Sequence, residues 1–155
     1  IDVTLNSIQA SQAPHVFSYN RREVKTPGNP LSHAVLRGAV DPHGVTVPNY
    51  HYEDLIWFAE TYNKRGLANA TIIVDTNHAN SNKKYAEQPR IAMEVMQSRR
   101  HSPLLKDMVR GFMIESFIEE GAQRTDGTVY GKSITDPCLG WKDSEKLIRD
   151  LAAMV

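Results

Sequence analysis

One histidine and two carboxylates follow apolar, strand-like stretches of the chain. His78 comes shortly after the β-branched run at residues 72–74, which we expect to form a strand buried on both faces. Glu115 ends an apolar stretch that begins at residue 108, and Asp136 closes a Lys-Ser-Ile-Thr segment. In a parallel α/β sheet the carboxyl ends of the strands share one rim, so these side chains could converge there. A neutral imidazole nitrogen and two carboxylate oxygens suit Mn²⁺, Fe²⁺, Zn²⁺ or Co²⁺. The pattern predicts a divalent metal site at His78, Glu115 and Asp136.

Each of these three residues also has a structural interpretation. A histidine after a buried strand can be a hydrogen-bonded structural residue, and Glu115 can pair with a neighbouring Arg or Lys. Asp136 precedes Pro137, where an aspartate can simply shape a turn. The metal site therefore depends on the three side chains actually meeting in the fold.

Arg37 is the main candidate for binding an anion. It ends a short apolar stretch that starts at residue 33. A guanidinium can donate two parallel hydrogen bonds to two oxygens of a phosphate or carboxylate group. A surface ion pair is the alternative for Arg37, and the same two interpretations hold for Lys83 and Lys132. Cys138 lacks the neighbouring histidine that would favour a nucleophile, so we expect it to be packed.

The elements that must position these residues alternate between strands and helices. Such alternation favours an α/β fold with right-handed βαβ units around a parallel sheet. The expected order is a helix at 2–10, a strand at 15–19, a hairpin excursion at 20–32 around Pro-Gly-Asn-Pro, a strand at 33–38, a helix at 52–65, a strand at 71–74, a helix at 83–100, a strand at 108–116, a loop at 119–131 and a helix from 143 or 144 to 154. Helical spacing puts Leu55, Phe58, Ala59 and Tyr62 on one face of the helix at 52–65, and Leu147, Ile148 and Leu151 inside in the last helix. Pro89 must lie in the first turn of the helix at 83–100 or start that helix.

The composition is that of one globular domain. The chain has 155 residues with 18 basic and 18 acidic side chains, so charge gives no reason to expect nucleic acid or a membrane as partner. No apolar run approaches the roughly 20 residues of a membrane span, and the single cysteine favours a reducing, cytoplasmic location. The chain opens on Ile-Asp-Val without an initiator methionine, and we expect an N-terminal portion to be missing.

Four segments together resemble a known family. They are Leu-Arg-Gly at 36–38, Val-Asp-Thr-Asn-His-Ala-Asn-Ser at 74–81, Met-Ile-Glu-Ser at 113–116 and, above all, Tyr-Gly-Lys-Ser-Ile-Thr-Asp-Pro-Cys-Leu-Gly-Trp at 130–141. In this order they are similar to type I 3-deoxy-D-arabino-heptulosonate 7-phosphate (DAHP) synthases, and the resemblance runs along the whole chain. It implies a (β/α)₈ TIM barrel, which takes about 250 residues. Residues 1–155 would then form only the C-terminal part of the barrel, about strands 6–8 with their helices.

The resemblance also implies a reaction and roles for single residues. Members of the family condense phosphoenolpyruvate with erythrose 4-phosphate and release phosphate, as the first step of the shikimate pathway. His78, Glu115 and Asp136 would be metal ligands, with Mn²⁺ as the expected ion, and Arg37 would hold the phosphate of phosphoenolpyruvate. The chain lacks the family's cysteine ligand, its catalytic lysine and the arginine and lysine that complete the phosphoenolpyruvate site, so we expect the isolated chain to be inactive.

Regulation and assembly are further expectations from the resemblance. The excursion at 20–32 corresponds to a segment that helps bind an aromatic amino acid effector in regulated members, but it is shorter here than in the enteric forms. Phe17 and Tyr19 lie where contacts with such an effector are expected. We also expect a homo-oligomer.

Two other functions remain open. A stand-alone half-barrel could act as a binding or assembly module that self-associates through open sheet edges, since unpaired strand edges invite association. Its interface would bury the free edges of the strands that contain Val16 and Met113. A generic metal-dependent hydrolase is a third candidate, supported only by the His/Glu/Asp set.

Overall fold

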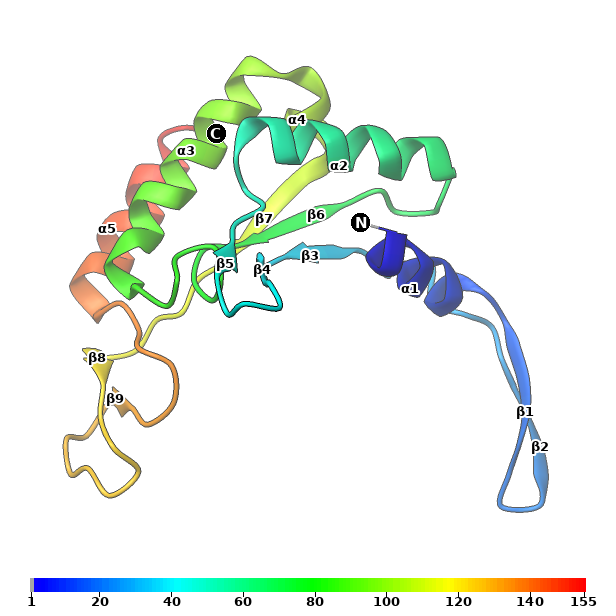
Figure 1. Cartoon of the computed structure of the whole chain (residues 1–155), viewed down its shortest axis with the longest axis horizontal. Coiled ribbons are helices and arrows are strands. Elements are labelled where there is room, and N and C mark those ends of the chain that lie inside the picture. Colours follow the sequence, from blue (N-terminus) through cyan, green and yellow to red (C-terminus); the bar gives the residue numbers. More distant parts are fainter. Residues whose placement is uncertain (1) are drawn as a thin grey trace.

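A three-stranded parallel sheet forms the centre of the structure, a computed structural model that describes residues 2–155 (Figure 1). Its strands are β3 (Ala34–Leu36), β6 (Ile72–Asp75) and β7 (Val109–Met113), in the order β3-β6-β7. Both pairings are parallel. The predicted α/β class and the parallel sheet are therefore confirmed.

Helices and short hairpins surround this sheet. The helices are α1 (Asp2–Gln12), α2 (Tyr52–Arg65), α3 (Gln88–His101), α4 (Pro103–Met108) and α5 (Trp141–Ala152), with a 3₁₀ turn η1 (Tyr85–Glu87). The other strands are β1 (His15–Tyr19), β2 (Arg22–Thr26), β4 (Ala39–Val40), β5 (Thr46–Val47), β8 (Glu119–Ala122) and β9 (Lys132–Ser133). Among residues 2–155, no helix combines the length and the apolar character that crossing a bilayer requires.

The two faces of the sheet differ in burial. Leu36, Ile72 and Val74 point to the side of the helices and are buried in the main core. Ile73, on the opposite side, is only half-buried, and Met113 is 40% exposed. Figure 1 shows α2, α3 and α4 along one side of the sheet and none of the described helices over the other. The expectation that the strand at 71–74 is buried on both faces is therefore wrong for this chain.

Helix α2 matches its predicted boundaries and inner face. Its apolar residues at helical spacing are all buried: Leu55, Phe58, Ala59 and Tyr62. The helix ends at Gly66, which adopts a left-handed conformation (φ 59°) and donates its N–H to the carbonyl of Asn63, as glycine does after many helices.

Two other helices begin elsewhere than predicted. Helix α3 starts at Gln88 rather than at residue 83, because Asn82 and Lys83 have positive φ and cannot belong to a right-handed helix; Pro89 does lie in its first turn. Helix α5 starts at Trp141 after Gly140. Ile148, predicted to be inside, is 61% exposed.

The hairpin formed by β1 and β2 extends away from the sheet (Figure 1). Its turn lies at Asn20 and Arg21, both with positive φ, and not at the Pro-Gly-Asn-Pro segment that sequence reasoning favoured. That segment instead returns to α1, where the N–H of Asn29 donates to the carbonyl of Ser11. Helix α4 and strand β8 were not predicted, and β8 occupies part of the expected loop at 119–131.

Candidate metal centre

His78, Glu115 and Asp136 meet at the carboxyl-end rim of the sheet. His78 follows β6, Glu115 follows β7, and Asp136 follows β9. One ligand atom of each residue lies within 4.8 Å of the other two. The Nε2 atom of His78 is 3.4 Å from Oδ2 of Asp136 and 3.8 Å from Oε1 of Glu115. The structure thus brings together three side chains that sequence reasoning could place only by their position after strands.

The donor set fits a divalent cation. An imidazole nitrogen and two carboxylate oxygens face a shared point, and all three side chains are partly accessible. Two carboxylates this close repel each other, and a divalent ion between them would relieve that repulsion. Nitrogen and oxygen donors of this kind suit Mn²⁺, Fe²⁺, Co²⁺ or Zn²⁺.

Asp75 fixes the orientation of the His78 ring. Its side chain is fully buried, and its Oδ2 lies 2.7 Å from Nδ1 of His78. Its Oδ1 accepts the N–H of Asn77 at 2.9 Å. With the proton on Nδ1, the lone pair of Nε2 faces Glu115 and Asp136.

Gln88 fixes the main chain at Glu115. The buried amide accepts the N–H of Glu115 at 2.8 Å and donates to its carbonyl at 2.9 Å. The same amide oxygen accepts the hydroxyl of Thr76 at 3.0 Å. One side chain of α3 thereby ties the ends of β6 and β7 together.

Asp136 has a cation beside it. Lys83 Nζ lies 2.9 Å from Oδ1 of Asp136, and this hydrogen bond lowers the pKa of the Asp136 carboxyl below its usual value. The second oxygen of the carboxylate is the one that faces His78. Asp136 therefore stays ionised and keeps one oxygen directed at the shared point.

Cys138 is packed, as predicted. It is 4% exposed, with Sγ 3.3 Å from the carbonyl of Asp136 and 3.9 Å from Oε2 of Glu115. Burial raises the pKa of the Cys138 thiol. The buried position of Cys138 and its contact with the carbonyl of Asp136 are those of a packing group.

Arg37 reaches the same rim from β3. Its Nε is 3.8 Å from Oδ2 of Asp75, and its side chain is 54% exposed. A guanidinium in this position faces the buried carboxylate on one edge and remains accessible to an anion from solvent. The partner of Arg37 is thus a buried carboxylate and not the surface carboxylate of the predicted ion pair, and the anion site stays a prediction.

A small amide network holds the β3 and β6 ends in place. Asn80 donates to the carbonyls of Leu36 at 3.1 Å and Asp75 at 2.7 Å, and it accepts the N–H of Asn49 at 2.9 Å. Asn49 in turn accepts the N–H of Gly38 at 2.8 Å. Sequence reasoning assigned no role to Asp75, Asn80 or Gln88; the placement of Asp75 three residues before His78 was the one available signal.

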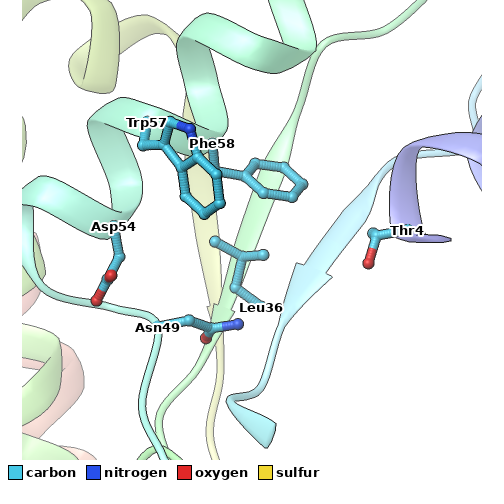
Figure 2. Close-up of a pocket in the computed structure, with 6 residues that line it drawn as sticks. All are labelled: Thr4, Leu36, Asn49, Asp54, Trp57 and Phe58. Carbon is cyan, nitrogen blue, oxygen red and sulfur yellow. The ribbon is translucent and has the colours of Figure 1, made fainter. Parts of the chain in front are cut away.

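A separate cavity of about 90 Å³ lies beside the free edge of β3, away from these carboxylates. Figure 2 shows Trp57 and Phe58 of α2 above Leu36, with Thr4 of α1 across the gap. Asn49 and Asp54 complete the lining. Trp57 is 62% exposed, so this recess is open to solvent.

Comparisons with known proteins identify the family of this chain. Residues 1–149 match the model of the DAHP synthetase I family. The chain is 36% identical to the Trp-sensitive phospho-2-dehydro-3-deoxyheptonate aldolase of Enterobacter agglomerans, with 100% of this chain and 44% of that protein aligned. It is 33% identical to the Trp-sensitive enzyme of Escherichia coli K12, with 99% of this chain and 43% of that protein aligned.

The fold is similar to part of a solved member. The phospho-2-dehydro-3-deoxyheptonate aldolase of Francisella tularensis SCHU S4 superposes with a TM-score of 0.84 at 26% identity, over 99% of this chain and 44% of that one. The chain therefore spans less than half the length of the relatives it matches. With the family model covering nearly all of its residues, the chain belongs to the DAHP synthetase I family.

Proposed function

We propose that this chain is the C-terminal part of the (β/α)₈ barrel of a metal-dependent DAHP synthase, about strands 6–8 with their helices. The whole enzyme would condense phosphoenolpyruvate with erythrose 4-phosphate to DAHP and phosphate. The observation that carries the proposal is the convergence of His78, Glu115 and Asp136 within 4.8 Å in a chain of this family. A cytoplasmic location is part of the same proposal.

The residues of this chain would bind and orient the reactants. His78, Glu115 and Asp136 would hold the divalent ion, Mn²⁺ first among the candidates, and the bound ion would supply Lewis acidity toward the aldehyde oxygen of erythrose 4-phosphate. Arg37 would hold the phosphate of phosphoenolpyruvate from the same rim. The enol carbon of phosphoenolpyruvate then attacks the aldehyde carbon, water adds to C2 and the C2–O bond to phosphate breaks.

Manganese binding tests the metal site without depending on turnover. We expect the chain to bind Mn²⁺, measured by loss of the electron paramagnetic resonance signal of the free ion. His78→Ala and Asp136→Ala should weaken binding at least about 10-fold, whereas His43→Ala, at an exposed loop position, should not. Binding that survives both ligand substitutions would remove the basis of the proposal.

Turnover tests whether this chain needs the rest of the barrel. Loss of phosphoenolpyruvate can be followed by its ultraviolet absorbance with erythrose 4-phosphate and Mn²⁺ present, with and without a chelator. We expect no turnover from the chain alone, because it spans less than half of its relatives. Chelator-sensitive turnover by the purified chain would contradict the partial-barrel assignment.

The uncovered face of the sheet supports a second candidate, a non-catalytic half-barrel that self-associates. The parallel sheet has edges at β3 and β7, and Ile73 and Met113 lie on the face that none of the described helices covers. The strand of Val16, expected to provide a free edge of this sheet, instead pairs only within the β1–β2 hairpin. Light scattering distinguishes the two candidates: a stable monomer that binds Mn²⁺ contradicts the assembly function.

An aromatic amino acid is the proposed effector. The curated relatives are named as Trp-sensitive, and the projecting hairpin carries Phe17 and Tyr19 with 48% and 65% exposure. Calorimetric titration with tryptophan, repeated on Phe17→Ala, tests this part. Identical heats for parent and variant would exclude Phe17 from effector binding.

A further inference from the structure

Asp75 is a fully buried carboxylate at the end of β6. Burying a charge is costly unless partners compensate it. Its side-chain partners both belong to the rim: Nδ1 of His78 at 2.7 Å and Nε of Arg37 at 3.8 Å from the same oxygen. The groups that compensate the burial of the Asp75 carboxylate are therefore both residues of the proposed site.

The hydrogen bond between Asp75 and His78 decides which ring nitrogen can bind a metal. A carboxylate only accepts, so Nδ1 of His78 must carry the proton. Nε2 is then the unprotonated nitrogen, and it is the atom that lies 3.4 Å from Asp136 and 3.8 Å from Glu115. The opposite tautomer would direct an N–H at the point where a cation must sit.

Asp75 also supports an unfavourable backbone conformation at His78. His78 has φ of 38°, a left-handed conformation that is unfavourable for a residue with a side chain. The N–H of Asn77 is held by the other oxygen of Asp75 at 2.9 Å. Asp75 therefore fixes both the turn that carries His78 and the rotation of its ring.

We propose that Asp75 is a positioning residue that holds His78 in the Nδ1–H tautomer and so sets the metal affinity of the rim. The effect on metal affinity rests on the metal-dependent function proposed above, whereas the effect on the tautomer of His78 does not. The tautomer itself can be measured without any metal.

The test uses Asp75→Asn, which keeps the shape and removes the charge. In alkaline buffer without metal, ¹⁵N–¹H NMR of the parent should show His78 protonated on Nδ1, and the variant should show a mixed or Nε2-protonated ring. The Mn²⁺ dissociation constant should rise about 10- to 100-fold. Val74→Ala is the matched control, because Val74 is buried on the same strand and lies in the helix-facing core.

The outcomes separate this proposal from the proposed function. An Nε2-protonated His78 in the parent overturns the role of Asp75, whether or not the chain binds Mn²⁺. The role of Asp75 is also overturned if the Mn²⁺ dissociation constant of Asp75→Asn lies within twofold of the parent's, or if Val74→Ala loses as much Mn²⁺ affinity as Asp75→Asn. A parent with the Nδ1–H tautomer that binds no Mn²⁺ overturns the metal site and leaves the positioning of the ring intact.

Discussion

The side-chain amide of Gln88 closes two hydrogen bonds on the main chain of Glu115, accepting from its N–H and donating to its carbonyl. The two hydrogen bonds are the same as those that a residue of a neighbouring strand would form with Glu115 just after the end of β7. It fixes the direction in which the Glu115 side chain leaves the sheet.

Gln88→Leu should lower both stability and metal affinity. The substitution leaves the N–H and carbonyl of Glu115 without their buried partner, which costs about 2–4 kcal/mol in the free energy of unfolding. Urea unfolding measures this change, with Mn²⁺ binding measured in parallel. Gln97→Leu, at an exposed position of the same helix, should change stability by less than about 0.5 kcal/mol, and equal losses in the two variants would contradict a specific role of Gln88.

Gly38→Ala should destabilise more than Gly44→Ala. Both glycines have positive φ, so an added side chain strains both backbones. Only at Gly38 would a Cβ also approach other atoms closely, 2.9 Å from Cβ of Ala79 and 3.0 Å from the nitrogen of Asn80, whereas nothing lies within 4 Å at Gly44.

The expected difference between the two glycine variants is about 1–3 kcal/mol in the free energy of unfolding. Since the atoms that must move directly follow His78, Gly38→Ala should also weaken Mn²⁺ binding, and Gly44→Ala should not. Equal thermal shifts for the two variants would show that close packing at Gly38 contributes nothing.

Lys83→Met should strengthen Mn²⁺ binding at neutral pH. Asp136 is ionised with or without Lys83 at that pH, and the ammonium 2.9 Å from its carboxylate opposes a second cation. We expect an affinity gain of about 3- to 10-fold at low ionic strength. Lys84→Met, also at an exposed position, is the matched control, and weaker binding in Lys83→Met would mean that Lys83 instead supports the site.

The same variant should change the response to acid. Lys83 lowers the pKa of Asp136 in the folded chain, so this pair stabilises the fold above the ordinary aspartate pKa and loses that contribution as the pH falls through the lowered value. In Lys83→Met the free energy of unfolding should therefore fall less steeply below about pH 4. Urea unfolding at stepped pH values gives the slope of the free energy of unfolding against pH for the parent and for Lys83→Met. Equal slopes in the two proteins would show that the Lys83–Asp136 pair does not contribute to acid unfolding.

Arg37→Lys should weaken phosphoenolpyruvate binding while leaving the metal site in place. Lysine keeps the charge but loses the paired donors that match phosphate oxygens. We expect about a 10-fold loss of phosphoenolpyruvate affinity by calorimetry with Mn²⁺ present, and an Mn²⁺ constant within about twofold of the parent. Arg110→Lys, whose side chain pairs with Asp107, is the control, and unchanged phosphoenolpyruvate binding in Arg37→Lys would remove Arg37 from the anion site.

The sequence predicted the parallel sheet and the places of His78 and Glu115 because both follow from local patterns. Asp136 follows β9, which pairs with β8 outside that sheet, so parallel topology does not explain its position. Buried strand runs and helical spacing are properties of neighbouring residues, and parallel topology alone brings His78 and Glu115 to one rim. The exposure of Ile73 could not be predicted, because it depends on which elements cover the far face of the sheet.

The supporting residues escaped prediction for a different reason. Gln88 hydrogen-bonds to Glu115, 27 positions away in the sequence, and Asn49 to Gly38, 11 positions away. Hydrogen bonds between residues so far apart in the sequence leave no repeating pattern from which they could be predicted. Hairpin and helix starts were misplaced where non-glycine residues adopt positive φ, as at Asn20, Asn82 and Lys83. Tertiary contacts favour those conformations against the local preference for negative φ.

The three candidate metal ligands follow the ends of three separate strands, so an unfolded chain cannot present them together. An ion that binds only the folded form opposes unfolding by an amount set by its concentration, about 2.7 kcal/mol at 100 times the dissociation constant. For a fold with one sheet face uncovered by the described helices, that is a large share of the typical total. Scarcity of the metal ion would then shorten the lifetime of this chain against proteases.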